Sequence, residues 1–202
     1  MAKTAIASPW KNDVERKQDR ALKREAVLAA AAHVFAERGY HRASLDEVAR
    51  VLNVTKPTLY YYFKNKEAML FACIEHGLYL LDAASEDEGA GENDNGMERL
   101  IAYLKRYATV SETDFGRCAA RISDNELSEQ SRKKIRRIKG VIDRKIRDLV
   151  SDGIADGSIA SSEPKVTAFA LAGALNSIGH WHADGTSLPG SRIVDEYITL
   201  LV

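Results

Sequence analysis

The segment SLDEVARVLNVTKPTLYYYFKNK, residues 44–66, contains the signals from which the fold of this chain can be predicted. Ser44 is followed three residues later by Glu47, the capping-box pattern that marks the start of a helix. Apolar residues then recur at positions i, i+3, i+4 and i+7, namely Leu45, Val48, Ala49 and Leu52. This spacing predicts a helix of two turns that buries one apolar stripe.

A turn and a second short helix follow the first. Asn53 tolerates the left-handed backbone that a tight turn requires. Thr55 can cap the second helix, and Pro57 fits its first turn because the amide that proline lacks is unpaired there in any case. Two short helices joined by such a turn form a helix-turn-helix, which inserts the start of its second helix into the major groove of DNA.

The second helix contains three consecutive tyrosines, residues 60–62, and Phe63 follows them. Leu59 and Phe63 are four residues apart, so they share a face that can pack on the preceding helices. The tyrosines then fan across the remaining surface, where a ring can contact a thymine methyl and a hydroxyl can bind a phosphate. Lys66 starts the next helix and can bind a phosphate together with free backbone amides. The alternative interpretation is an aromatic cluster that only packs helices together.

Helical periodicity dominates the rest of the chain, and no run has the alternating pattern of a strand. A first helix is expected at 17–38 with Gly39 as its stop, and a fourth at 66–83 with Asn65 as its cap. Further helices are expected at 97–111, 114–122, 128–151, 163–182 and 191–202.

These patterns predict an all-α protein with about nine helices, an N-terminal three-helix helix-turn-helix domain and a C-terminal helical bundle. We expect the DNA-binding domain at 20–66 and the second domain at 67–202. Residues 1–19 are interpreted as a flexible arm, and the alternative is that this arm reaches along DNA. The acidic, glycine-containing stretch 85–96 is expected to be an exposed connection.

Composition favours an ordinary globular protein, with 45% hydrophobic residues and zero formal net charge. The charge is uneven, because residues 1–70 carry 13 Lys and Arg against 8 Asp and Glu, and the remainder carries 16 against 21. A basic N-terminal part hints at a polyanionic partner. The most apolar stretch, 166–179, is too short to span a bilayer, and no apolar signal-peptide core is present, so we expect a cytoplasmic protein and no membrane partner. Cys73 and Cys118 lack metal or redox spacing and are interpreted as packing residues, with a redox-sensing thiol as the alternative.

The stretch VLAAAAHVFAERGYHRASLDEVARVLNVTKPTLYYYFKNKEAML, residues 27–70, resembles the DNA-binding domain of the tetracycline-repressor (TetR) family of bacterial transcriptional regulators. The resemblance rests on the Phe-x-x-x-Gly-Tyr ending, the Val-Ala pair, the turn, and Leu-Tyr-x-x-Phe-x-Asn-Lys. Two positions depart from the family pattern. Asn53 stands where the family often has glycine, and Leu45 stands where a small polar residue is common, which could remove one phosphate contact.

The resemblance implies a role for each matching residue. Base edges would face Lys56, Pro57, Thr58 and Tyr61. Tyr60 would bridge a base methyl and the DNA backbone, while Ser44, Tyr62 and Lys66 would hold phosphates. Thr55, immediately before the recognition helix, completes this DNA-facing set.

Two segments near the C-terminus are candidates for a dimer interface. The stretch 169–181 is rich in Ala, Gly and Ser, which lets helices approach closely, and 193–201 presents one apolar stripe. The candidate interface residues are Gly173, Ser177, Ile193, Tyr197, Leu200 and Leu201. Two such helices from each subunit could form a four-helix interface, as the resemblance also implies. The alternative is that both helices are core of one protomer.

Tyr103, Tyr107, Phe115 and Trp181 are candidates for the wall of an internal effector pocket, although aromatic residues of a helical bundle also serve as plain core. His180 and His182 lack a third metal ligand, so we expect no metal and assign them to a pocket or interface. The cationic run 132–137, with Lys139, is interpreted as a solvated helix face. It could instead meet an anionic effector such as an acyl-coenzyme A.

The sequence therefore predicts a homodimeric, sequence-specific DNA-binding regulator, a repressor that a small-molecule effector releases from a near-palindromic operator. The sequence leaves the identity of the effector open, and the candidates are an acyl-coenzyme A or another hydrophobic ligand. We see no catalytic constellation and no cofactor site, so we do not expect an enzyme. The alternative is a helical enzyme or scaffold protein that kept the fold without specific DNA binding.

Overall fold

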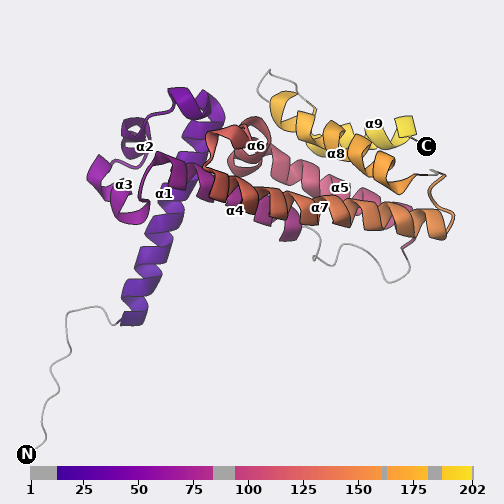
Figure 1. The fold of residues 1–202 in the computed structure, drawn as a ribbon, viewed down its shortest axis with the longest axis horizontal. Helices are drawn as coiled ribbons and strands as arrows, with labels where there is room; N and C mark the ends of the chain where they lie inside the picture. Colours follow the sequence, from indigo (N-terminus) through magenta and orange to yellow (C-terminus); the bar gives the residue numbers. More distant parts are fainter. Residues whose placement is uncertain (1–12, 84–93, 161–162, 182–187, 202) are drawn as a thin grey trace, which may run out of the picture.

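The structure, a computed structural model, describes residues 13–83, 94–160, 163–181 and 188–201, and all regular elements among them are helices (Figure 1). The helices are α1 (Asp13–Arg42), α2 (Leu45–Val51), α3 (Lys56–Tyr62), α4 (Lys66–Ala83), α5 (Gly96–Glu112), α6 (Asp114–Arg121), the 3-10 helix η1 (Asp124–Glu126), α7 (Glu129–Ala155), α8 (Pro164–Trp181) and α9 (Gly190–Leu201). The all-α class predicted from the sequence is confirmed.

A local capping box starts one helix of the head, which we define as α1–α3. Ser44 Oγ accepts a hydrogen bond from the Glu47 amide at 3.1 Å, and Glu47 Oε2 accepts one from the Ser44 amide at 3.0 Å. This is the capping box expected for α2. Thr55 precedes α3, but its hydroxyl pairs with the Thr58 hydroxyl at 3.0 Å and caps no helix amide.

Helix α1 differs from its predicted bounds at both ends. It begins at Asp13, so residues 13–19 of the expected arm are helical, and residues 1–12 lie outside the described part of the chain. Gly39 interrupts the helix with φ 72° and ψ 162°, a region that is open to glycine almost alone, and one further turn follows to Arg42. The predicted stop therefore acts as a sharp kink.

One hydrophobic core runs from the head into the body, which we define as α5–α9. Helix α4 begins beside the head and packs on α1, and Asn65 Oδ1 caps it by accepting from the Ala68 amide at 2.7 Å. The helix continues between α6 and α7 of the body (Figure 1). Its inner face includes Cys73, which is fully buried, as is Cys118 of α6. Burial raises the pKa of the Cys73 thiol.

Helix α5 starts against the turn that ends α7. Asn95 and Glu98 form a second capping box. Two side chains that follow α7 accept hydrogen bonds from two further amides at the start of α5. Asp156 Oδ2 accepts from the Gly96 amide at 2.6 Å, and Ser158 Oγ accepts from the Met97 amide at 3.0 Å. Hydrogen bonds that the sequence pattern did not reveal thus join the start of α5 to the end of α7.

Candidate nucleic-acid interface and effector cavity

The outer face of α3 combines cationic and aromatic side chains that remain in solvent. Leu59 is fully buried and Phe63 is 5% exposed, so they anchor α3 on the head. Tyr60 and Tyr61 are 48% and 63% exposed. Large rings left in water beside a fully packed core mark a contact surface rather than a packing cluster.

Lys56 at the start of α3 is held by Asp46 of α2. Its Nζ lies 3.0 Å from Asp46 Oδ2, and this hydrogen bond raises the pKa of the Lys56 ammonium. Pro57 beside it is exposed and Thr58 is half-buried. A cation and two small side chains thus occupy the helix start, which is the part of a recognition helix that contacts bases.

Helix α1 supplies two arginines that sequence reasoning missed. The Arg20 guanidinium lies 5.1 Å from the centre of the Tyr61 ring, and the Arg24 guanidinium lies 4.9 Å from the centre of the Phe63 ring. The available signal was a pair of basic residues four apart, which share one helix face. The Tyr61 and Tyr62 rings meet edge to face with centres 5.0 Å apart, so the aromatic and cationic groups form one surface.

The three expected phosphate-binding residues also contact other residues of the protein. Lys66 Nζ donates to the Tyr40 carbonyl and lies 4.4 Å from the centre of the Tyr40 ring. Partial burial lowers the pKa of Lys66. An ammonium has three N–H groups, and the Ser44 hydroxyl accepts in its capping bond, so both retain hydrogens that can be donated to a phosphate. Tyr62 is half-buried beside Tyr61.

A cavity of about 270 Å³ lies in the body among α4–α8. Its walls are mostly apolar, and Tyr107 Oη donates to Asn176 Oδ1 at 2.9 Å between two of the lining side chains. Lys139 and Asp143 of α7 bring charge to one side. The lining is Leu78, Leu81, Tyr107, Ser111, Gly116, Ala119, Ala120, Lys139, Ile142, Asp143, Ile146, Ala172 and Asn176.

Only part of the expected pocket wall meets this cavity. Tyr107 lines it, whereas Tyr103 is buried beside it in the core, with ring centres 6.4 Å apart. Phe115 instead packs on the His76 ring at 4.4 Å, because α6 turns that side chain toward α4. The side chain of Trp181, like those of His180 and His182, lies outside the described part of the structure.

The expected dimer residues are distributed over different environments. Ile193 is 6% exposed because α9 packs chiefly on α5, so it belongs to the core of one protomer and not to a free face. Gly173 is exposed and Ser177 is half-buried, as is Tyr197. The side chains of Leu200 and Leu201 lie outside the described part.

The expected set of interface residues omitted two exposed apolar residues of α8, although Phe169 begins the candidate stretch 169–181. Val166 and Phe169 are 63% and 54% exposed. They lie on the same helix face as Gly173, where nothing stands within 4 Å of the position that a Cβ would take. This face of α8 is thus an open apolar strip of the kind that subunit interfaces cover.

A helix-turn-helix head with an exposed recognition helix, joined to a helical body with a cavity, is the architecture of a DNA-binding regulator. The chain belongs to the TetR family. Residues 27–73 match the model of the bacterial regulatory proteins of the tetR family, and residues 93–202 match the tetracyclin repressor-like C-terminal domain. The protein is therefore a transcriptional regulator and not an enzyme.

Similar proteins include regulators and solved structures of this family. The Fatty acid metabolism regulator protein of Bacillus subtilis (strain 168) is 29% identical over 144 residues, which cover 69% of each chain. PfmR from Thermus thermophilus shares the fold at 24% identity and a TM-score of 0.77, over 87% of this chain and 96% of that one. AibR, solved in complex with isovaleryl coenzyme A and operator DNA, shares it at 24% identity and a TM-score of 0.76, over 89% and 97%.

The part of the chain that the structure describes contains no helix with both the length and the apolar character needed to cross a bilayer. Within the same residues, no three His, Cys, Asp or Glu side chains are grouped so that they could hold a metal ion.

Proposed function

We propose that the protein is a homodimeric repressor that reads its operator with the outer face of α3. Base edges face Lys56, Pro57, Thr58 and Tyr61, and Tyr60 bridges a base methyl and the DNA backbone. Phosphates are held at Ser44, Tyr62 and Lys66, with Thr55 at the margin. The observation that carries this proposal is the exposure of Tyr60 and Tyr61 on an otherwise packed head. Arg20 beside Tyr61 adds a further phosphate contact.

Dimerisation uses the open face of α8 together with α9. Exposed Val166 and Phe169 support this arrangement, and Gly173 leaves room for close approach of a second helix. A symmetric dimer presents its two recognition helices about one DNA turn apart, roughly 34–36 Å, to a near-palindromic operator. The DNA-binding domain is assigned to residues 20–66, and the effector-binding and dimerisation domain to residues 67–202. A regulator of this kind acts in the cytoplasm, where the DNA is.

The effector is an acyl-coenzyme A whose acyl group enters the cavity among α4–α8. Two observations support this class. AibR was solved with isovaleryl coenzyme A, and a relative is a fatty acid metabolism regulator. The cavity walls here are mostly apolar, while the Tyr107–Asn176 hydrogen bond offers polar groups for a thioester carbonyl.

The test starts from genomic fragments that the full-length protein selects from its source genome. Operator affinity is then measured with isovaleryl-, octanoyl- and stearoyl-coenzyme A, with free coenzyme A as the control. We expect one acyl chain length to lower affinity by about 5–150-fold, the usual range of allosteric coupling. Equal responses to all thioesters and to free coenzyme A would exclude the acyl group as the recognised part. If the protein bound random DNA and this binding did not weaken as the salt concentration rose, DNA recognition itself would be excluded.

A further inference from the structure

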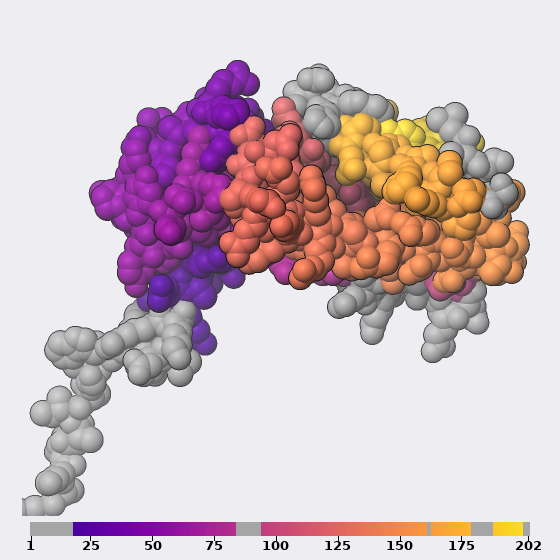
Figure 2. Space-filling view, in the orientation of Figure 1, coloured from indigo at the N-terminus to yellow at the C-terminus, as the bar shows by residue number. Residues whose placement is uncertain are grey.

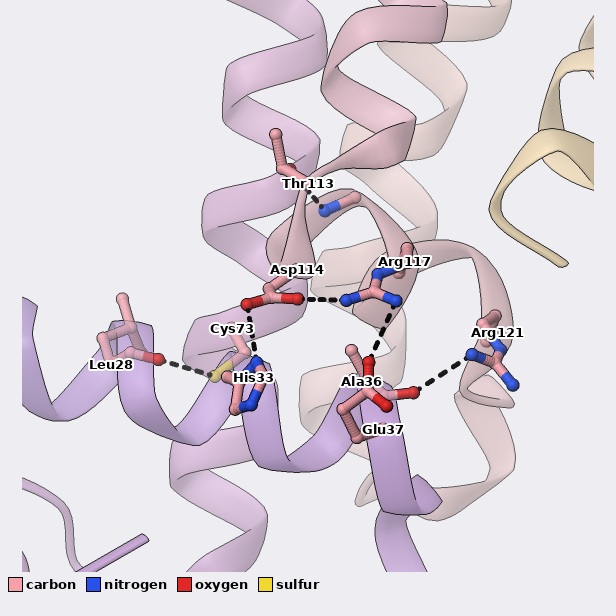
Figure 3. A network of polar contacts seen from close by, with 10 residues as sticks. Leu28, His33, Ala36, Glu37, Cys73, Thr113, Asp114, Arg117 and Arg121 are labelled. Atoms are coloured by element: carbon pink, nitrogen blue, oxygen red, sulfur yellow. Dashed lines mark hydrogen bonds and ion pairs between the residues drawn. The ribbon is translucent and has the colours of Figure 1, made fainter. Parts of the chain in front are cut away.

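Helix α6 lies between the cavity and α1 of the head, so that one of its faces lines the cavity and the other contacts α1. Gly116, Ala119 and Ala120 line the cavity. On the opposite face Arg117 and Arg121, with Asp114 at the start of the helix, extend to α1 (Figure 3). A helix of eight residues therefore contacts both the cavity and the head.

The contacts to α1 are a chain of three ion pairs and one separate hydrogen bond, which we together call the α1–α6 clamp. Arg117 Nη1 lies 3.0 Å from Glu37 Oε1, and its Nη2 pairs with Asp114. Asp114 Oδ2 in turn lies 3.1 Å from His33 Nδ1. Arg121 Nη1 donates to the Ala36 carbonyl at 3.1 Å. The Arg117 side chain is only 15% exposed, so its bridge between two carboxylates is less screened than an ordinary surface pair.

Helix α6 has little freedom to move without its neighbours. A Cβ on Gly116 would overlap the Val110 carbonyl oxygen, so the start of α6 lies directly on the end of α5. Thr113 Oγ1 also accepts from the Gly116 amide at 3.1 Å. On another side, a Cβ on Gly77 of α4 would stand 2.5 Å from the Phe115 carbonyl oxygen. A displacement of the cavity face of α6 would therefore also move α4 and α5, because their backbones are in contact with that of α6.

We infer that the α1–α6 clamp transmits occupancy of the cavity to the head. A group that fills the cavity displaces the Ala119 and Ala120 face, and Arg117 carries that displacement to Glu37 of α1. Interdigitated faces and charge pairs have discrete arrangements, which is what coupling between sites requires. This inference rests on the proposed function, since it takes the cavity as the effector site. The clamp would thus be a second link between the cavity and the head, besides α4, and it ends on α1.

The test fills the cavity from α8, away from the clamp, with Ala172→Phe, and measures operator affinity of the full-length protein. It compares the wild-type background with Arg117→Met, which keeps an unbranched side chain but loses the charge pairs. Lys105→Gln is the control, because it removes an ion pair, 2.8 Å long, that joins α5 to α9 and involves neither α1 nor α6. Circular dichroism melting checks each fold. Ala172→Met replaces Ala172→Phe if the larger residue unfolds the protein, and saturating octanoyl-coenzyme A is a second way to fill the cavity.

We expect cavity filling to lower operator affinity on the order of tenfold in the wild-type and Lys105→Gln backgrounds. In Arg117→Met the loss should shrink by about threefold or more. Arg117→Lys should give an intermediate loss, because one ammonium cannot form the forked contact with two carboxylates. Equal losses in all backgrounds would overturn the clamp and leave the proposed function standing. No loss in any background, by substitution or by thioester, would overturn the cavity as a control site and the clamp with it.

Discussion

The turn between α2 and α3 depends on the backbone of a single residue. Asn53 has a φ of 53°, in the left-handed region, and it is the one non-glycine residue with positive φ among those described. Asn enters this region more readily than other side chains. The backbone there sets how α3 leaves α2, and so it sets where Lys56 and Tyr61 stand.

Asn53→Val should lower the free energy of unfolding by about 1–2 kcal/mol, the cost of a left-handed backbone for an ordinary L-residue. Asn53→Gly is the matched control and should leave stability unchanged or slightly higher. Urea unfolding followed by circular dichroism measures both. A loss of similar size in Asn53→Gly would show that the Asn side chain, and not the backbone, holds the turn.

Base-reading and phosphate-binding side chains should respond differently to truncation. Tyr61→Ala, like Lys56→Ala, should cost about 1–3 kcal/mol on the operator and relax preference at particular base pairs. Lys66→Ala should weaken all DNA sequences about equally and lower the salt slope by roughly one. Binding titrations on operator and random duplexes at several salt concentrations distinguish the two. Uniform losses in all variants would contradict the assignment of base contacts to α3.

Helix boundaries could be predicted to within a few residues because their signals are local. Ser44 and Asn65 cap α2 and α4 as their side chains suggested, since a cap needs only the amides that follow it in the chain. Thr55 shows the limit of this reasoning. Its hydroxyl pairs with the Thr58 hydroxyl and not with a helix amide. The 3-10 helix η1 had no periodic pattern and was missed.

The wall of the cavity and the open face of α8 could not be read from spacing, because they depend on which helices pack together. Tyr103 and Tyr107 are one turn apart on α5, yet only Tyr107 reaches the cavity. Ile193 lies on an apolar stripe that α5 covers, while Phe169 remains exposed. A stripe shows that a helix has a partner, but it does not say whether that partner is the same chain.

Asp156→Asn should weaken the junction between α7 and the start of α5. Hydrogen bonds from Ser158 and from the Gly96 amide lower the pKa of Asp156 below its usual value of 3.8. A carboxyl group whose pKa is lower in the folded than in the unfolded state stabilises the fold at pH values above its unfolded-state pKa. This stabilisation disappears as the pH falls through its native-state pKa. Melting temperatures should therefore be lower for the variant at pH 7, and the difference from wild type should disappear as pH falls from 3.8 through the lower native pKa. A constant difference across this range would mean that the charge is not what stabilises the junction.

One continuous core joins head and body through α4 and α6, and Figure 2 shows the two parts meeting along an unbroken surface beside the start of α7. At that boundary Glu67 of α4 accepts from the Ser128 amide at 3.1 Å, just before α7. His41 of α1 lies 2.9 Å from Glu126 of η1. The orientation of the head is therefore tied to the body at several points, and a dimer of bodies would fix the spacing of two heads.

Phe169→Glu should convert the dimer to a monomer without unfolding it, since the ring is already 54% exposed in one protomer. Tyr79→Glu on α4 is the matched control, because Tyr79 is also 54% exposed. Sedimentation velocity gives the oligomeric state, and operator binding should fall sharply for Phe169→Glu alone. A dimeric Phe169→Glu, or a monomeric Tyr79→Glu, would place the subunit interface elsewhere.

The pair between Asp46 and Lys56 gives the protein a way to change its target without changing a residue that reads DNA. Asp46 is itself 63% exposed and lies 3.0 Å from the Lys56 ammonium, so it determines where that cation stands before DNA arrives. A neutral or longer side chain at position 46 would let Lys56 reach a neighbouring base pair or a phosphate. Operator preference in descendants of this chain could thus drift through α2, while every residue on the outer face of α3 stays the same.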